Sequence, residues 1–275
     1  MKESKSLEFL YNTGIGRSIL KILVDRKVSC VAGHFLSSGL SCPLIPYYVK
    51  KYNMDLTNAI DTEYCSFNEF FMRRNKFLVD EGEKTIVSPC EAYLSAYSID
   101  SDSHFHIKHV DYDLSRLLRD GKLSERFNGG TCLIFRLEPT NYHRYIYPVK
   151  GRIRATMAID GVLHTVRPIA TDSLPVFIEN SREYAIIDSS IAGRFVQMEV
   201  GALLVGKIVN EYNGHIVRKG EEKGHFEFGG STIMLLFEKD AVSLCDKIAN
   251  VKNTGEEIPV NIGEAIAQGT YNKDK

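Results

Sequence analysis

The sequence lacks the features of several specialised protein classes. Its 275 residues include six cysteines but no Cys-x-x-Cys pair, so reduced thiols are expected rather than a disulfide framework or a zinc site. The formal net charge of −1 offers no general basic surface for nucleic acid. No run reaches the roughly 18 apolar residues that a membrane-spanning helix needs. With 44% hydrophobic residues, the chain instead has the composition of a globular protein of one large or two small domains.

The N-terminal part, from about residue 7 to residue 72, has the pattern of helices. Apolar residues follow helical spacing from Leu20 to Val31, and basic residues such as Arg17 and Lys21 lie between them. Such a basic amphipathic helix either packs on its own core or lies in a membrane interface. The Cys42–Pro46 stretch is expected to separate two helices, and Ser66 is a candidate N-cap.

From about Ile86 onward, short apolar runs and glycines indicate strands and tight turns. The predicted fold class is α+β. We expect an N-terminal helical, membrane-associating region over residues 1–80 and a mostly β, barrel-like catalytic domain over residues 81–275. A short helix is predicted over Asp111–Leu118, and the candidate strands are Thr131–Leu137, Phe195–Val200, Leu203–Val209 and Thr232–Phe237.

The most informative segment is Gly229-Gly230-Ser231-Thr232, a bend between two apolar runs. Such a bend often belongs to an ordinary hairpin. It also suits a peptide bond that cuts itself, because glycine lets the backbone be strained and closely approached. The Ser231 hydroxyl would attack the Gly230 carbonyl. The resulting ester would break by elimination and leave a pyruvoyl group at the new N-terminus.

Two other segments carry groups that can act with this serine. Glu91 follows a Ser-Pro-Cys turn, and His143 follows a buried-looking strand. A base, an orienting carboxylate and a nucleophile on separate loops can form a triad, here Glu91, His143 and Ser231. No metal site is expected, because the nearby His104, His106 and His109 show no recognised ligand spacing.

Taken together, these segments resemble the phosphatidylserine decarboxylase proenzyme family over most of the chain. The matching pieces are Ser66–Phe71, Ser88-Pro89 with Glu91, Tyr142-His143-Arg144, Asn180–Glu183, Met198–Ala202 with Val205-Gly206, and Lys219–Gly224 leading into Phe228–Thr232.

The resemblance implies autocatalytic cleavage between Gly230 and Ser231. The products are a β chain (1–230) and an α chain (231–275), which stay associated as a heterodimer. The α chain begins with a pyruvoyl cofactor made from Ser231, whose ketone draws off electrons as CO2 leaves. The implied reaction converts phosphatidylserine to phosphatidylethanolamine. The implied location is peripheral, on the cytoplasmic face of the cell membrane.

The chain departs from the family pattern at two positions. The family usually has an aspartate where this chain has Glu91, and often has a second histidine where it has Ile146. In the implied mechanism, His143 removes the Ser231 proton while Glu91 orients the imidazole. The departures leave open whether Glu91 supports cleavage, and whether His143 serves both maturation and decarboxylation or another group contributes.

Three alternative functions remain. The two departures favour an inactive, non-cleaving lipid-binding paralogue of the same fold. A biotinyl- or lipoyl-type carrier domain would need a modifiable lysine at an exposed hairpin tip, whereas Lys207 lies in a strand-like run. A serine hydrolase would need a Gly-x-Ser-x-Gly elbow before a helix, whereas Ser231 precedes a strand-like run.

Overall fold

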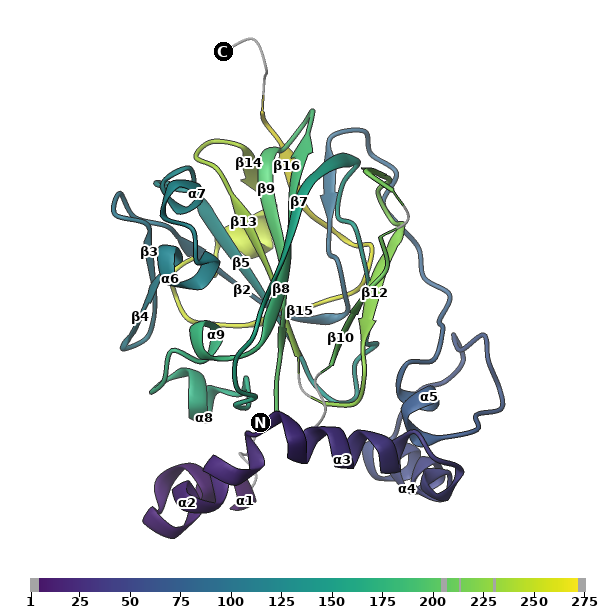
Figure 1. Ribbon diagram of the computed structural model, residues 1–275. Helices are drawn as coiled ribbons and strands as arrows, with labels where there is room; N and C mark the ends of the chain where they lie inside the picture. Colours follow the sequence, from purple (N-terminus) through teal and green to yellow (C-terminus); the bar gives the residue numbers. More distant parts are fainter. Residues whose placement is uncertain (1–4, 204–206, 213, 230, 272–275) are drawn as a thin grey trace.

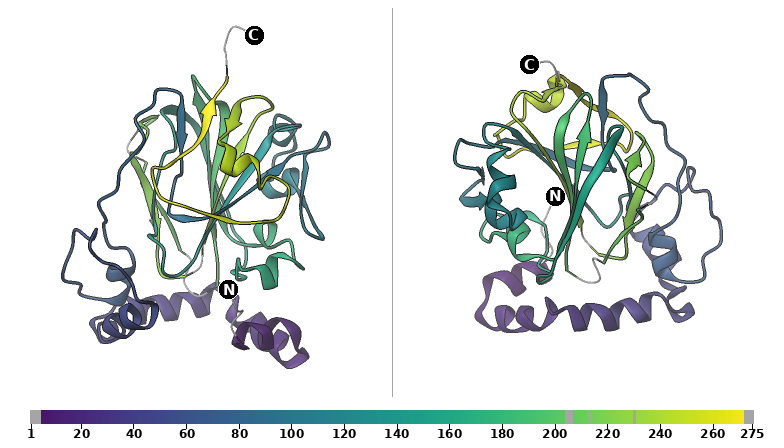
Figure 2. Two further views of the ribbon diagram at one scale, coloured as in Figure 1. Left: turned by 180° about the vertical axis from the view of Figure 1, so that it is seen from behind. Right: turned by 45° about the horizontal axis from the view of Figure 1, so that its top comes forward.

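A computed structural model describes residues 5–203, 207–212, 214–229 and 231–271 (Figure 1). The first part of the chain is helical and lies along one end of a β-rich body, at the opposite end from the C-terminus (Figures 1 and 2). Its helices are α1 (Lys5–Asn12), α2 (Gly14–Leu23), α3 (Arg26–Leu36), the 3-10 turn η1 (Gly39–Ser41), α4 (Leu44–Tyr52) and α5 (Phe67–Phe71).

The helix boundaries follow local signals in the sequence. The side chain of Thr13 accepts a hydrogen bond from Gly16 N at 2.9 Å and caps α2. Ser66 caps α5 by accepting from Glu69 N at 3.1 Å, which confirms the predicted N-cap. Of the Cys42–Pro46 stretch, only Cys42 and Pro43 separate η1 from α4, because α4 begins at Leu44 and contains Pro46 in its first turn. The domain boundary near residue 80 stays a prediction.

An antiparallel sheet of eight strands forms the centre of the body, in the order β11-β7-β8-β9-β13-β5-β2-β15. It confirms the strands predicted over Thr131–Leu137, Phe195–Val200 and Thr232–Phe237. In sheet order, the strands are Ile216–Val217, Gly151–Ile159, Arg182–Ser189, Gly193–Gly201, Ser231–Phe237, Thr131–Leu137, Ala92–Ser98 and Ile258–Val260.

Three smaller sheets accompany it. In the first, β12 (Glu222–Phe226) lies between β10 (Ile208–Asn210) and β6 (Arg144–Ile146). The other two are β1-β16-β14 (Thr85–Val87, Ala265–Gly269, Val242–Leu244) and the hairpin β3-β4 (His104–Ile107, Val110–Asp113). The remaining helices are α6 (Leu114–Leu118), α7 (Gly121–Glu125), α8 (Pro168–Thr171), α9 (Val176–Glu179) and α10 (Asp246–Ala249).

Two of the predicted elements differ from the structure. The helix expected over Asp111–Leu118 begins only at Leu114, because residues up to Asp113 pair in β4 and the Asp113 side chain caps α6. In the strand expected over Leu203–Val209, only the last two residues belong to β10, and residues 204–206 lie outside the described part of the chain.

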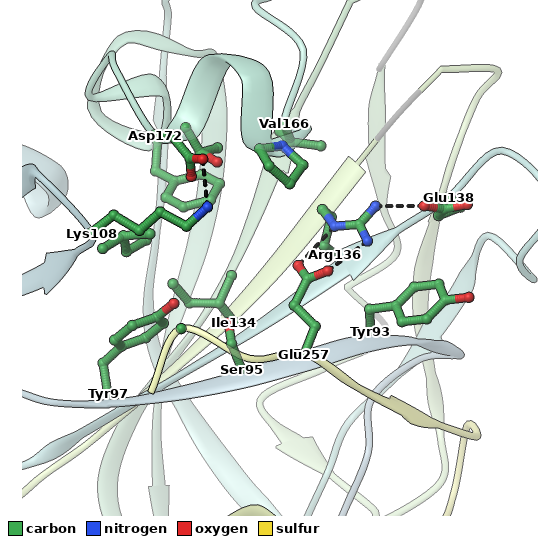
Figure 3. A pocket seen from close by; sticks show the side chains of 15 residues that line it. Tyr93, Ser95, Tyr97, Lys108, Ile134, Arg136, Glu138, Val166, Asp172 and Glu257 are labelled. Atoms are coloured by element: carbon green, nitrogen blue, oxygen red, sulfur yellow. Dashed lines mark hydrogen bonds and ion pairs between the residues drawn. The ribbon is translucent and has the colours of Figure 1, made fainter. Parts of the chain in front are cut away.

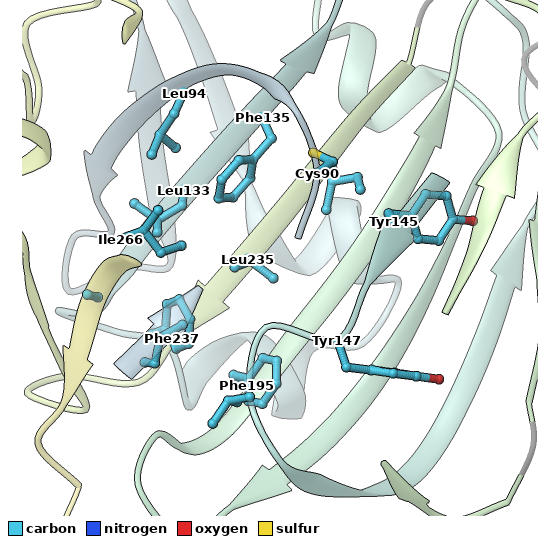
Figure 4. Packing of buried hydrophobic residues seen from close by; sticks show 14 of the residues in the cluster. Cys90, Leu94, Leu133, Phe135, Tyr145, Tyr147, Phe195, Leu235, Phe237 and Ile266 are labelled. Atoms are coloured by element: carbon cyan, nitrogen blue, oxygen red, sulfur yellow. The ribbon is translucent and has the colours of Figure 1, made fainter. Parts of the chain in front are cut away.

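The core occupies both faces of the large sheet. On β13, Ile233, Leu235 and Phe237 point to one face, whereas Met234 and Leu236 point to the other. The first face packs with Tyr145 of β6 and with Tyr147 just beyond it (Figure 4), and with Phe226 of β12. The second packs with α6, α7 and α9 (Figure 1). The architecture is therefore mixed α+β, and the sheets of the described residues are not closed into a barrel.

No helix among the described residues is both long enough and apolar enough to cross a membrane.

Candidate active site

Ser231 is the first residue of β13, between Leu137 of β5 and Gly201 of β9. Its side chain is fully buried, and its Oγ has no hydrogen-bond partner among the described residues. Gly229, two residues earlier, has a φ of 148°, a conformation that side-chain-bearing residues rarely adopt. Gly230, the other predicted cleavage residue, lies outside the described residues. The structure thus holds the hydroxyl in the interior, without a hydrogen bond to any described residue.

His143 immediately precedes β6 and is also fully buried. Its Nδ1 lies 2.8 Å from the carbonyl oxygen of Asn141. Because a carbonyl oxygen only accepts, Nδ1 must carry the proton, and Nε2 of the neutral ring is left with a free lone pair. Nε2 has no partner among the described residues, so this atom is available as a base.

The charge state of His143 follows from its surroundings. Burial lowers the pKa of the ring from its usual value to about 3; the bond to Asn141 opposes this shift, and the charge of Arg73 adds to it. The imidazole is therefore neutral at physiological pH. A proton that it accepts is quickly passed on, which suits a transfer between two nearby atoms.

Helix α5 connects the histidine to the predicted cleavage segment. The ring of Phe71 packs on His143 with centroids 4.0 Å apart and on Phe228 with centroids 4.9 Å apart. The backbone N–H of Phe226 donates to the His143 carbonyl at 2.9 Å, and that of Phe228 donates to Asn68 Oδ1 at 3.0 Å. The chain just before Ser231 is therefore fixed to both the histidine and the helix.

Ser231 and His143 lie on the same side of the large sheet. Ser231 shares its side of β13 with Ile233, which belongs to the core cluster that also contains Tyr145 and Tyr147. His143 directly precedes β6, and continuing the alternation of that strand back by one residue puts its side chain on the same side as Tyr145. Both groups are thus directed into the space between the large sheet and the β10-β12-β6 sheet.

Glu91 does not contact the imidazole directly. Its Oε1 accepts from Asn141 Nδ2 at 2.8 Å, and its Oε2 accepts from Tyr142 N at 3.3 Å. The expectation that this carboxylate orients the ring therefore needs a correction: Glu91 holds the 141–142 loop, and the Asn141 carbonyl orients His143. No feature of the sequence marks Asn141 for this role, because any residue type carries the same carbonyl.

Ile146, which stands where the family often has a second histidine, cannot accept or donate a proton, and its side chain faces away from Ser231. Its side chain packs with Val87, Tyr142 and Ile262. Its neighbours Tyr145 and Tyr147 face the core cluster instead, as alternation along a strand requires.

A buried ion pair that the sequence did not reveal lies in this same interior. Lys223 Nζ donates to Glu199 Oε2, and both side chains are fully buried. Burial raises the pKa of the Glu199 carboxyl and lowers that of the Lys223 ammonium, while their mutual attraction opposes both shifts. In the sequence, Phe195–Val200 alternates like a strand with one solvated face, which hides this burial.

A separate pocket of about 360 Å³ lies on the opposite face of the large sheet (Figure 3). Its wall includes Arg136, the ladder partner of Thr232. Arg136 donates to Glu257 at 2.7 Å and to Glu138 at 2.8 Å, so its charge is already balanced.

Among the described residues, one group has the geometry to hold a metal ion. Ligand atoms of Glu211, Glu222 and His225 lie within 4.8 Å of one another. Glu222 is already paired with Arg144, whose positive charge disfavours a second cation there. His104 and His106 both contact Asp111 in the β3-β4 hairpin.

Comparison with known proteins gives consistent results. A family model described as phosphatidylserine decarboxylase matches residues 67–268. The phosphatidylserine decarboxylase proenzyme 2 of Clostridium acetobutylicum is 38% identical over 266 residues, covering 95% of this chain and 91% of its own. The phosphatidylserine decarboxylase proenzyme of Ruminiclostridium cellulolyticum is 41% identical over 270 residues, covering 94% and 90%. That of Clostridium perfringens (strain ATCC 13124) is 37% identical over 271 residues, covering 95% and 92%.

Proposed function

This chain belongs to the phosphatidylserine decarboxylase family, an enzyme family, and on that premise we propose that it converts phosphatidylserine to phosphatidylethanolamine and CO2. We further propose that it first cuts itself between Gly230 and Ser231. One observation carries the proposal: Ser231 Oγ and His143 Nε2 are both buried on the same side of the sheet, and neither has a partner among the described residues. Buried polar atoms are nearly always paired, so a serine hydroxyl and an imidazole nitrogen that are both unpaired in one interior favour a reactive site.

The surroundings of Ser231 fit a pyruvoyl group made from this residue. The serine begins a strand held on both sides, so a new N-terminus there would stay fixed in the sheet. When formed, the pyruvoyl ketone supplies an electron sink for loss of CO2 from a bound amine substrate.

The residues of this chain can perform the first step as follows. Nε2 of His143 takes the proton from Ser231 Oγ, which attacks the Gly230 carbonyl. His143 then returns the proton to the departing backbone nitrogen of residue 231, a transfer that its low pKa favours. Phe71 covers the ring and excludes water, while Glu91 and Asn141 keep Nε2 in the basic form.

The strand pairing of residues 231–275 with the rest of the chain supports a stable heterodimer of the fragments 1–230 and 231–275. Strand β13 lies between β9 and β5, and all seven of its residues are buried. Strand β15 pairs with β2, and β16 pairs with β1. Cleavage before Ser231 would leave all of these contacts in place, so we expect the fragments to stay associated.

We also propose peripheral attachment of the helical end to the cytoplasmic face of the cell membrane. Apolar side chains are exposed there without a described cover, including Ile15 (72% exposed), Ile22 (65%) and Val31 (73%). Arg17 and Lys21 are exposed beside them, a combination that suits an anionic lipid surface. Phe228 packs with side chains of α3, α4 and α5, so the proposed cleavage segment lies against this end.

Flotation with anionic vesicles tests the attachment. Ile22→Asp should reduce the bound fraction, whereas Leu78→Asp should not. Leu78 is 91% exposed, but it lies outside the helices. Equal binding of the two variants would contradict attachment through the helices.

Intact mass spectrometry of the purified protein, beside Ser231→Ala and His143→Gln, tests the cleavage. We expect two fragments that split at Gly230/Ser231 in the parent protein, with a blocked N-terminus on the smaller one, and a single uncut chain in both variants. Release of CO2 from phosphatidylserine vesicles should accompany the cut form alone. A parent chain that remains whole at 31.0 kDa and releases no CO2 would overturn the proposal and favour the non-cleaving, lipid-binding paralogue.

A further inference from the structure

The buried pair Glu199–Lys223 lies close to Ser231 in the ladder. Gly201 is directly opposite Ser231, and Glu199 is two residues before Gly201 on the same strand. Glu199 and Ser231 are therefore diagonal neighbours on one sheet face, about 7–8 Å apart, which is within reach of a long side chain. Gly201 has no side chain, so β9 places no group between them.

One oxygen of the Glu199 carboxylate is unused. Its Oε2 accepts from Lys223 and, at 3.3 Å, from Asn210 Nδ2. Its Oε1 is buried and accepts from no described residue. Asn210 also holds Lys223, through Oδ1 at 3.0 Å from Nζ, so Oε2 of Glu199 is fixed while Oε1 has no partner in the described part of the chain.

Burying the Glu199 carboxylate is energetically unfavourable for the fold. Glu183 of β8 is directly opposite Glu199, an arrangement of like charges that destabilises a ladder. Lys223 reaches the pair from β12 at a shift of register between Glu222 and Gly224, and such bulges re-aim side chains near active sites. A buried pair of this kind can often be replaced by apolar residues without loss of stability, so stability alone does not account for it.

We propose that Glu199 is a second catalytic base of this site, which removes the Cα proton of residue 231 when the chain is cut, with Lys223 and Asn210 as positioning residues. The inference rests on the proposed self-cleavage. In the ester formed from Ser231, the Cα–H proton passes to Glu199 Oε1, and its electron pair forms the Cα=Cβ bond. The Cβ–Oγ bond breaks, and Oγ leaves as part of the Gly230 carboxylate. Atoms and charge balance without another reactant.

The basicity of His143 and of Glu199 indicates which of the two steps each group can perform. His143, whose pKa burial lowers to about 3, is suited to moving a proton between oxygen and nitrogen but is a weak base toward carbon. Burial raises the pKa of Glu199, and the ion pair with Lys223 opposes this rise. Glu199 is thus the stronger base of the two on this face.

Hydroxylamine distinguishes the two steps, because it cleaves esters and leaves ordinary peptide bonds intact. We expect Glu199→Gln to slow maturation by about 100-fold or more, within the usual range for loss of a general base. The variant should accumulate a chain of unchanged mass that hydroxylamine cuts at Gly230/Ser231. His143→Gln, blocked before the ester, should resist hydroxylamine, as should Ser231→Ala.

The double variant Glu199→Gln/Lys223→Met separates chemistry from stability. With no charge left unpaired, it should melt close to the Ser231→Ala protein and still stop at the ester. Complete maturation of the double variant at the parent rate would show that the pair is structural only. A Glu199→Gln chain that resists hydroxylamine would also overturn the assignment, because the carboxylate would then act before the ester. An uncut parent chain would refute the proposed self-cleavage itself.

Discussion

Removing the Glu91 carboxylate tests whether this residue acts on the histidine directly or through the loop. In a triad with direct contact, loss of the orienting carboxylate leaves the wrong tautomer and costs about 10⁴ in rate, or roughly 5.5 kcal/mol. Here the Asn141 carbonyl sets the tautomer, and Glu91 supplies two hydrogen bonds to the loop, at 2.8 Å and 3.3 Å. Bonds to a charged acceptor contribute about 1.5–3 kcal/mol each, and Glu91 is only half-buried.

We therefore expect Glu91→Gln to slow self-cleavage by about 10- to 100-fold, with Asn141 and His143 still in contact. Glu91→Asp should also slow self-cleavage, because the shorter side chain lengthens both hydrogen bonds to the loop. The assay is the rate at which the 231–275 fragment appears after cell-free synthesis, followed by intact mass. Asn141→Ala is the matched control, because it keeps the backbone carbonyl and removes the contacts of its side chain with Glu91 and with Glu138 N. A loss near 10⁴ for Glu91→Gln, or faster cleavage for Glu91→Asp, would refute the indirect role.

Two further predictions concern the groups around His143. In the Ser231→Ala background, His143 should lower the free energy of unfolding by about 1.4 kcal/mol for each unit by which the pH falls from about 6.5 toward about 3. The reason is that the histidine of the unfolded chain is protonated in this range, whereas the buried ring of the folded chain stays neutral. Adding His143→Gln should remove that part of the slope in urea titrations, and identical slopes would contradict a buried neutral ring. Gly224→Ala would place a Cβ 2.1 Å from Val209 O, so it should lower the melting temperature and slow cleavage, whereas Gly121→Ala, with open space around it, should do neither.

Local signals in the sequence predicted the parts of the fold that depend on near neighbours. The N-cap at Ser66 is set by a bond to a residue three positions away. The strands over Thr131–Leu137 and Thr232–Phe237 follow from mostly apolar runs, which two covered sheet faces require. The helix expected over Asp111–Leu118 failed in its first half because pairing with β3 overrides helical preference there.

The candidate site was only partly predictable for a related reason. The sequence named Glu91, His143 and Ser231, but whether a carboxylate meets a ring or a neighbouring loop depends on tertiary geometry. Asn141 acts through its main chain, which residue type does not reveal. Alternation over Phe195–Val200 predicts a half-buried strand but does not show which of its polar side chains is buried. Glu199 is fully buried and pairs with Lys223 of β12, a contact that depends on the tertiary structure.

The site also depends on the helical end, through a short chain of aromatic contacts. Phe228 packs on Phe67 and Phe71 of α5, with centroids 5.1 Å and 4.9 Å apart, and Phe71 packs on His143. Tyr48 of α4 joins the same cluster. Close-packed aromatic side chains have little free space between them and cannot be compressed. A shift of α4 or α5 against the sheets must therefore displace either the imidazole or the segment leading to Ser231. In the proposed mechanism, the helices therefore help to align His143 with the Ser231 hydroxyl, and in the proposed membrane attachment a lipid surface would act on the helices that set this alignment.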